Sequence, residues 1–130
     1  MDLVLICKLL LSAFLGSIIG LERQTHHKNS GVRTMALISL GSCVFSIVSM
    51  SFPGADPTRV IAQIVTGIGF LGAGIIFKSG MNVYGLTSAA TIWCTAALGV
   101  AIGIEMYQLA IVLTIVILII NSVIKKSKNE

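Results

Sequence analysis

Charge is scarce in this chain, and negative charge is the scarcest. Of its 130 residues, 11% are charged and only five are acidic, whereas 55% are hydrophobic and the mean hydropathy is +0.98. Soluble domains carry about 25% charged residues. The composition therefore excludes an ordinary soluble domain and predicts an all-α integral membrane protein.

The motifs of several other protein classes are also missing. Cys7, Cys43 and Cys94 lie in separate apolar segments without a C-x-x-C pair, so neither a disulfide framework nor a zinc site is indicated. His26 and His27 are adjacent, which excludes the H-E-x-x-H zinc pattern and favours solvated side chains. No nucleophile has an assigned base, and there is no Walker A motif. Neither an enzyme nor a resident cofactor is predicted.

Five apolar segments are present, and they predict five transmembrane helices in one domain covering residues 1–130. Thr34 is placed to cap the second helix, and Thr87 or Ser88 to cap the fourth. The N-terminus lacks the basic region and cleavage site of a secretory signal, so we expect the first span to be retained. The predicted spans are residues 3–21, 34–52, 60–77, 86–103 and 107–124.

The nine Lys and Arg residues predict the orientation. With five spans, seven of them fall on one side, and the positive-inside rule makes that side cytoplasmic. The N-terminus is then outside and the C-terminus is in the cytoplasm, and the net charge of +4 marks this face rather than a nucleic-acid site. The cytoplasmic set is Arg23, Lys28, Arg33, Lys78, Lys125, Lys126 and Lys128, and the outer set is Lys8 and Arg59.

The third segment is unusual because it is rich in glycine. Its 18 uncharged residues between Arg59 and Lys78 would reach about 27 Å as a helix. Each glycine costs roughly 1 kcal/mol relative to alanine, a cost that close approach of neighbouring helices offsets in lipid. We therefore expect this helix to pack on two faces, in the middle of the bundle. Its glycines are Gly67, Gly69, Gly72 and Gly74, with Gln63 on the face of Gly67 and Gly74.

Three of those glycines also spell G-x-G-x-x-G. This pattern indicates dinucleotide binding only when it follows a strand, opens a helix and precedes an acidic residue by about 20 positions. Here it lies inside an apolar helix, and the next acidic residue is Glu105. The pattern therefore predicts helix packing rather than nucleotide binding.

Small residues also line the other spans. Ser12, Gly16 and Gly20 follow each other at four-residue spacing on the first span, and the face they form is expected to meet another helix. The hydroxyls of the second span predict close helix contact, with a polar pathway as the alternative. The fourth span is expected to pack against the third. The second-span hydroxyls are Ser39, Ser42, Ser46 and Ser49, and the fourth-span line is Ser88, Thr95, Gly99 and Gly103.

Two charged residues on the outer side have more than one interpretation. Lys8 either extends to the outer headgroups or forms an ion pair with Asp56 or Glu105. Asp56 precedes Arg59 by three residues, a spacing that allows an ion pair across the first turn of the third span.

Four motifs in succession resemble the membrane domain of the MgtC/SapB family. They are Glu22-Arg23 at the end of the first span, Gly31-Val-Arg33-Thr34 at the start of the second, Asp56-x-x-Arg59 with the run from Ala62-Gln63 to Gly74, and Gly85-Leu-Thr87 to Trp93. The resemblance covers nearly the whole chain.

This resemblance implies a bacterial inner-membrane protein with five spans, an outer N-terminus and a role in adaptation to low magnesium. In some members that role is linked to virulence, and regulation of membrane partners such as the ATP synthase has been proposed. Many relatives continue into a soluble cytoplasmic domain, whereas this sequence stops a few residues after its last predicted span.

Two functional hypotheses follow. In the first, the protein is regulatory and acts by helix packing within a homo-oligomer or against a membrane partner. In the second, subunits together form a path for Mg²⁺ or another small ion, although none of the five carboxylates is placed in mid-membrane. The candidate packing residues are Gly67, Gly69, Gly72, Gly74, Ser12, Gly16 and Gly20, and the candidate polar residues are Glu22, Arg23, Arg33, Asp56, Arg59, Gln63, Thr87 and Trp93.

Overall fold

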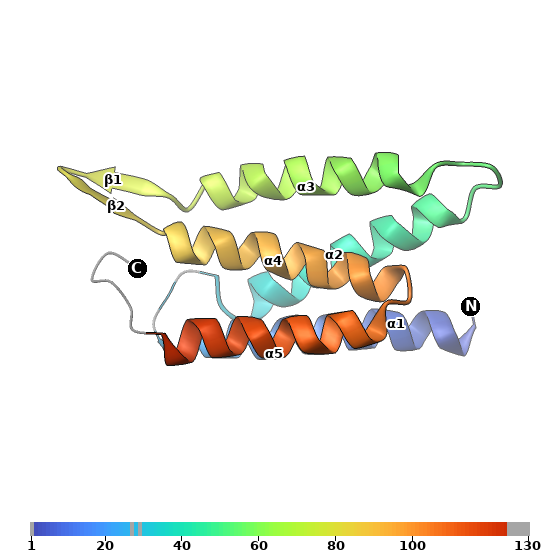
Figure 1. Ribbon diagram of the computed structural model, residues 1–130, viewed down its shortest axis with the longest axis horizontal. Coiled ribbons are helices and arrows are strands. Elements are labelled where there is room, and N and C mark those ends of the chain that lie inside the picture. The colour runs from blue at the N-terminus through green and yellow to red at the C-terminus, as the bar shows by residue number, and fades with distance from the viewer. Residues whose placement is uncertain (1, 27, 29, 125–130) are drawn as a thin grey trace.

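The computed structural model describes residues 2–26, 28 and 30–124, and in these it shows five helices and one short hairpin (Figure 1). The His27 side chain and the basic tail with Lys125, Lys126 and Lys128 lie outside the described residues. In chain order the elements are α1 (Leu3–Thr25), α2 (Val32–Met50), α3 (Pro57–Ala73), β1 (Phe77–Ser79), β2 (Asn82–Tyr84), α4 (Leu86–Gly103) and α5 (Tyr107–Val123).

The prediction of an all-α fold is confirmed, apart from a short hairpin that follows the third helix. α3 ends at Ala73 rather than at residue 77, and β1 pairs with β2 in an antiparallel hairpin. Gly80 makes the tight turn with φ +64°, a conformation that glycine adopts without strain. Gly85 has φ +87°, and a β-carbon there would overlap the Ile75 carbonyl oxygen. The hairpin therefore depends on glycines at its turn and at its return to α4.

Acidic residues cap two of the helices. Asp2 accepts a hydrogen bond from the Leu5 amide at 2.8 Å, and Asp56 caps α3 ahead of Pro57. The caps predicted at Thr34 and at Thr87 or Ser88 are wrong, because Gly31 and Gly85 occupy the N-cap positions of α2 and α4 without a side-chain hydrogen bond.

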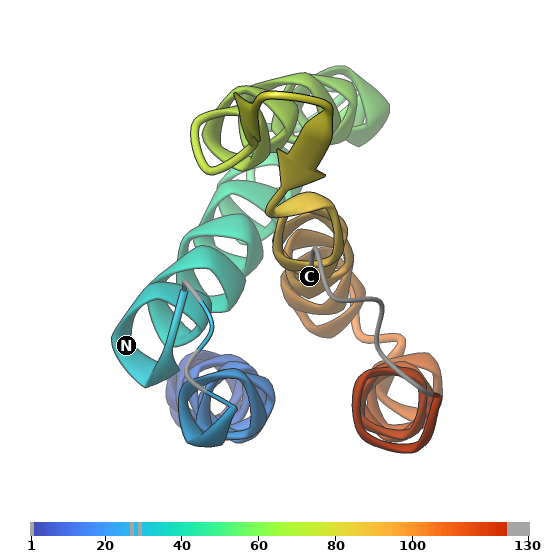
Figure 2. The same ribbon diagram turned by 90° about the vertical axis from the view of Figure 1, so that its left-hand side faces the viewer.

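The third helix is peripheral, contrary to the prediction that it lies in the middle of the bundle. Viewed along the helix axes, α3 lies at one edge, while α4 lies between the other helices and contacts all four of them (Figure 2). Only Ile64 and Gly72 of α3 are buried. The central position therefore belongs to α4, in which ten residues are buried.

The closest helix packing occurs at glycines on α1 and α4, both against α2. A β-carbon added at Gly16 would lie 2.7 Å from the Met35 carbonyl oxygen, and one at Gly20 would lie 2.6 Å from that of Gly31. One at Gly103 would lie 2.9 Å from the Cys43 carbonyl oxygen. Real β-carbons do not approach so closely, so these backbones meet only because the side chains are absent.

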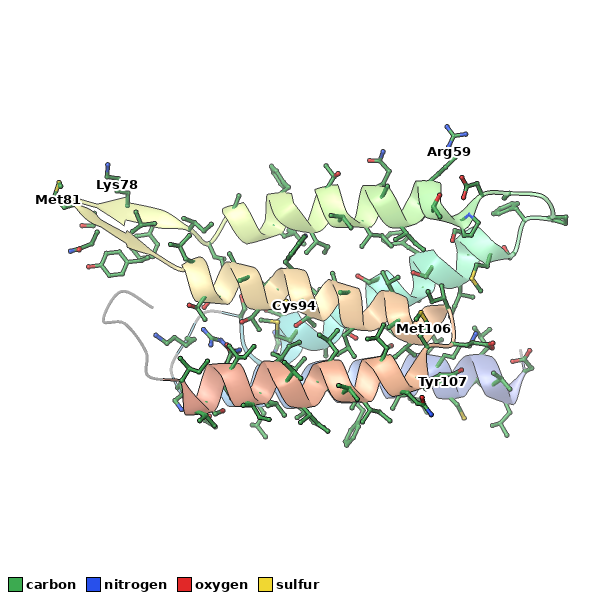
Figure 3. The ribbon with its side chains drawn as sticks, in the orientation of Figure 1. Arg59, Lys78, Met81, Cys94, Met106 and Tyr107 are labelled. Carbon is green, nitrogen blue, oxygen red and sulfur yellow. The ribbon has the colours of Figure 1, made fainter. Side chains whose placement is uncertain are left out.

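Three helices of the described chain, α1, α2 and α4, are long and apolar enough to cross a membrane, and α5 is a shorter apolar helix. The carboxyl ends of α1, α3 and α5 and the amino ends of α2 and α4 lie together at one end of the bundle, at the left in Figure 1. Arg59 and Lys78 point away from the bundle near its opposite ends (Figure 3). The fold therefore places Arg23 of α1, Arg33 of α2 and Lys78 of β1 at the same end of the bundle.

Candidate functional site

A buried polar cluster lies where α1 ends beside the start of α4. The Arg23 side chain is 1% exposed, and its guanidinium donates a hydrogen bond to Ser88 Oγ at 2.8 Å. The neighbouring Glu22 side chain is 8% exposed, with a carboxylate oxygen 3.9 Å from Arg23 Nη1. His26 Nδ1 lies 2.8 Å from the other carboxylate oxygen. The family motif Glu22-Arg23 thus ties α1 to α4, with His26 beside it rather than fully in solvent.

A second polar contact ties α5 to α4 near the same end. Asn121 is 7% exposed, and its side-chain amide donates to Thr91 Oγ1 at 3.1 Å. The Thr91 hydroxyl in turn donates to the Thr87 carbonyl at 2.8 Å. Candidate residue Thr87 therefore takes part through its backbone oxygen.

At the opposite end, Lys8 joins α1 to the turn between α4 and α5. Its ammonium group lies 3.1 Å from the Glu105 carboxylate and donates to the Gly103 carbonyl at 3.3 Å. Of the two interpretations of Lys8, the ion pair is the one observed. Glu105 has φ +70°, a conformation that costs most non-glycine residues energy. The strained residue of this turn is thus the one whose side chain pairs with Lys8 of α1.

The ion pair expected between Asp56 and Arg59 is absent from the described residues. The Asp56 carboxylate instead accepts hydrogen bonds from the hydroxyl and the amide of Thr58, at 2.6 Å and 3.0 Å. These hydrogen bonds lower the Asp56 pKa, and the bond from the Thr58 hydroxyl has a larger effect than the bond from the Thr58 amide. Asp56 is an N-cap here, and its short bonds to Thr58 take the place of a bridge to Arg59.

An open apolar groove of about 520 Å³ runs between α2 and α3. Gly41 of α2 and Gly67 of α3 both line it, and a β-carbon added at either would meet no atom within 4 Å. Gln63, also in its lining, is one of its few polar residues. Two helices thus expose bare backbone to one groove, although helical glycines usually serve close packing.

Of the predicted packing residues, those of the first span are buried, and those of the third lie against another helix only in part. Ser12, Gly16 and Gly20 are buried. Gly72 packs against Ala89, with its added β-carbon 3.5 Å from that methyl group. Gly74 is the C-cap of α3, whereas a β-carbon added at Gly67 or Gly69 would meet no atom within 4 Å. Arg33 and Trp93 are exposed.

The sequence analysis did not predict that the fourth span packs most closely against the second. Gly99 and Gly103 of α4 pack against the backbone and the serine β-carbons of α2, although α4 also contacts α3 as predicted. The four serines of α2 are buried, and two of them donate to carbonyls of their own helix, Ser46 to Ser42 and Ser49 to Ser46. The lines of small residues on α2 and α4 were the sequence signal that could have predicted this packing.

The described residues contain no group of three or more His, Cys, Asp or Glu side chains that could hold a metal ion. Mg²⁺ prefers carboxylate and water oxygens in octahedral geometry. The buried carboxylate of Glu22 faces Arg23 and His26 instead, so its neighbours already supply positive charge and a nitrogen.

An apolar helical bundle with polar contacts buried between its helices defines a membrane protein of the all-α class. The chain belongs to the MgtC family, which it matches over residues 9–130. It is 46% identical to Protein MgtC of Salmonella typhimurium (strain LT2) over 125 residues, which cover 96% of this chain and 54% of that protein. It is 50% identical to Protein MgtC of Brucella abortus (strain 2308) over 112 residues, covering 85% of this chain and 47% of that protein. The chain thus spans about half the length of these relatives, and no solved structure matches it significantly.

Proposed function

We propose that the chain is the membrane domain of a bacterial inner-membrane regulator of adaptation to low magnesium, which acts by packing α3 against another membrane helix. It crosses the membrane five times with its N-terminus outside, as the distribution of Lys and Arg indicates. The magnesium role rests on the family resemblance, and the packing role rests on the structure of α3.

The observation that carries this proposal is the bare backbone at Gly67. In α1 and α4 the glycines Gly16, Gly99 and Gly103 are covered by α2, so glycine serves packing wherever the bundle is closed. Gly67 and Gly41 expose the same bare backbone, but a β-carbon added at either would meet no atom within 4 Å. The groove between them is open and apolar, which suits one more transmembrane helix. That helix comes from a second copy or from a membrane partner; the ATP synthase is one candidate.

Filling the groove tests this proposal. Gly67→Leu should reduce the oligomer mass in nanodiscs or the cross-linking of the chain to a partner in native membranes, and should impair growth at low magnesium. Val65→Leu is the matched control, because Val65 is an exposed α3 residue outside the groove lining. Unchanged assembly and unchanged growth with Gly67→Leu would refute packing through this groove.

Transport between subunits is the alternative outcome of the same work. It would be established by a saturable Mg²⁺ flux into liposomes that Glu22→Gln or Asp56→Asn abolishes. That result would make transport, rather than regulation, the function of the chain, regardless of the effect of Gly67→Leu on assembly.

A further inference from the structure

A second apolar hollow lies on another side of α3, along its seam with α4. It has a volume of about 300 Å³, and a smaller hollow of about 130 Å³ lies along the same pair of helices. Trp93 lines both hollows. A β-carbon added at Gly69 would meet no atom within 4 Å, so the larger hollow is open beside bare backbone. Its lining includes Gly69, Ala73, Ile76, Leu86, Ala90 and Trp93.

The β1–β2 hairpin lies at the end of this seam, because it connects α3 to α4 and projects beyond both helices (Figure 1). The Phe77 and Tyr84 rings stack with centroids 5.0 Å apart. Lys78 is exposed and points away from the bundle, and Met81, at the tip, is 94% exposed (Figure 3). An aromatic pair, a lysine and an exposed methionine thus occupy the point where the seam leaves the helices.

We infer that this seam binds an anionic phospholipid of the surrounding bilayer, with an acyl chain along α3 and α4 and the headgroup at the hairpin. The hollow is apolar and faces outward, as an acyl chain requires. Tyrosine is enriched at the headgroup level of membranes, and lysine side chains extend to the interface with their charge toward phosphate. Both residue types occur in the hairpin, at Tyr84 and Lys78.

Charge favours a lipid over a protein helix as the occupant of this seam. Neither the α2–α3 groove nor the α3–α4 hollows have a lysine or arginine in their lining, so a headgroup would depend on cations at their ends. The α3–α4 seam ends at Lys78, at the same end of the bundle as the first turn of α2, which contains Arg33. Anionic lipid is attracted by about one kilocalorie per mole for each such lysine near the surface, which corresponds to about a fivefold preference.

Trp93 provides a direct probe, because it is the only tryptophan of the chain and lines the hollow. The full chain is reconstituted into vesicles in which brominated phosphatidylglycerol or brominated phosphatidylcholine replaces an equal fraction of the lipid. We expect Trp93 fluorescence to be quenched at about a fivefold lower fraction of the brominated anionic lipid than of the zwitterionic one. Equal quenching by the two lipids would refute the inference.

Two variants test where the lipid headgroup and the acyl chain bind. Lys78→Gln should abolish the preference for the anionic lipid, whereas Arg59→Gln, which removes an exposed cation at the opposite end, should preserve it. Gly69→Leu should fill the hollow and weaken the quenching of Trp93 by both lipids. A preference that persists in Lys78→Gln, or quenching unchanged in Gly69→Leu, would overturn the assignment.

If the seam is shielded in native membranes but remains accessible in pure lipid vesicles, its occupant is a protein. That result would also refute lipid binding. The inference rests on the chain spanning a membrane, and its readout is independent of assembly through Gly67. Gly67→Leu should leave the quenching of Trp93 unchanged, so the proposed packing and the proposed lipid site can fail separately.

Discussion

Gly99 of α4 lies against the backbone of Ser39 of α2, so closely that a methyl group in its place would overlap the Ser39 carbonyl oxygen. A β-carbon there would also lie 2.9 Å from the Ser42 β-carbon. This contact joins the two helices at the centre of the bundle. The sequence predicted close packing through glycine on the third helix, but the closest such contact is made by the fourth helix.

Replacing Gly99 should therefore destabilise the fold. We expect Gly99→Ala to lower the free energy of unfolding by about 1–3 kcal/mol, the range for overpacked cores. Gly41→Ala is the control, since its new methyl group meets nothing and should raise stability by roughly 0.5–1 kcal/mol. Unfolding in micelles, followed through Trp93 fluorescence, measures both. Equal effects of the two substitutions would contradict the observed packing.

Removing Arg23 should cost more than removing any exposed arginine. Arg23→Ala leaves the buried carboxylate of Glu22 without its guanidinium, and breaking a buried pair costs about 3–5 kcal/mol. Ser88→Ala, which deletes only one hydrogen bond to a charged group, should cost about 1.5–3 kcal/mol. Arg33→Ala serves as the exposed control and should stay within about 0.5 kcal/mol of the wild type. A similar loss from Arg23→Ala and Arg33→Ala would show that the cluster does not hold α1 to α4.

The Lys8–Glu105 contact combines an ion pair with backbone strain, and two substitutions separate them. Glu105→Gln removes the charge and should cost about 0.2–1 kcal/mol, because the carboxylate side chain is 55% exposed. Glu105→Gly also relieves the positive φ, which costs other residues roughly 1–2 kcal/mol. The glycine variant should therefore be more stable than the glutamine variant in thermal unfolding. The reverse order would mean that the turn is not strained.

The Asp56 cap should make the stability of α3 depend on pH. Hydrogen bonds from Thr58 lower the Asp56 pKa, so the carboxylate stabilises the fold above its unfolded pKa of about 3.9. This stabilisation is lost as the pH falls through the lowered folded pKa. The stability difference between the wild type and Asp56→Asn should therefore shrink on acidification from about pH 6 to about pH 2. A difference that stays constant over that range would rule out the carboxylate as the source.

Several features could be read from the sequence because they depend on local chemistry. The apolar segments from residue 86 to residue 103 and from residue 107 to residue 123 became helices almost at the predicted bounds. The four-residue spacing of Ser12, Gly16 and Gly20 indicated one helix face, and all three residues are buried. The hairpin was missed because residues 74–77 continue an apolar run, while the two glycines that allow the turn act only through their backbone angles.

The sequence by itself determined the class of protein, since scarce charge and long apolar runs leave the chain no stable state in water and fix one helix per run. It also determined which helix faces carry bare backbone. Only the tertiary structure decided how those faces pair, because a glycine-rich face fits any helix that comes close enough. α1 and α4 both pack against α2, which leaves α3 at the edge with grooves on two sides. Burial of Arg23 beside Ser88 was likewise decided by that pairing, since 65 positions separate the two residues along the chain.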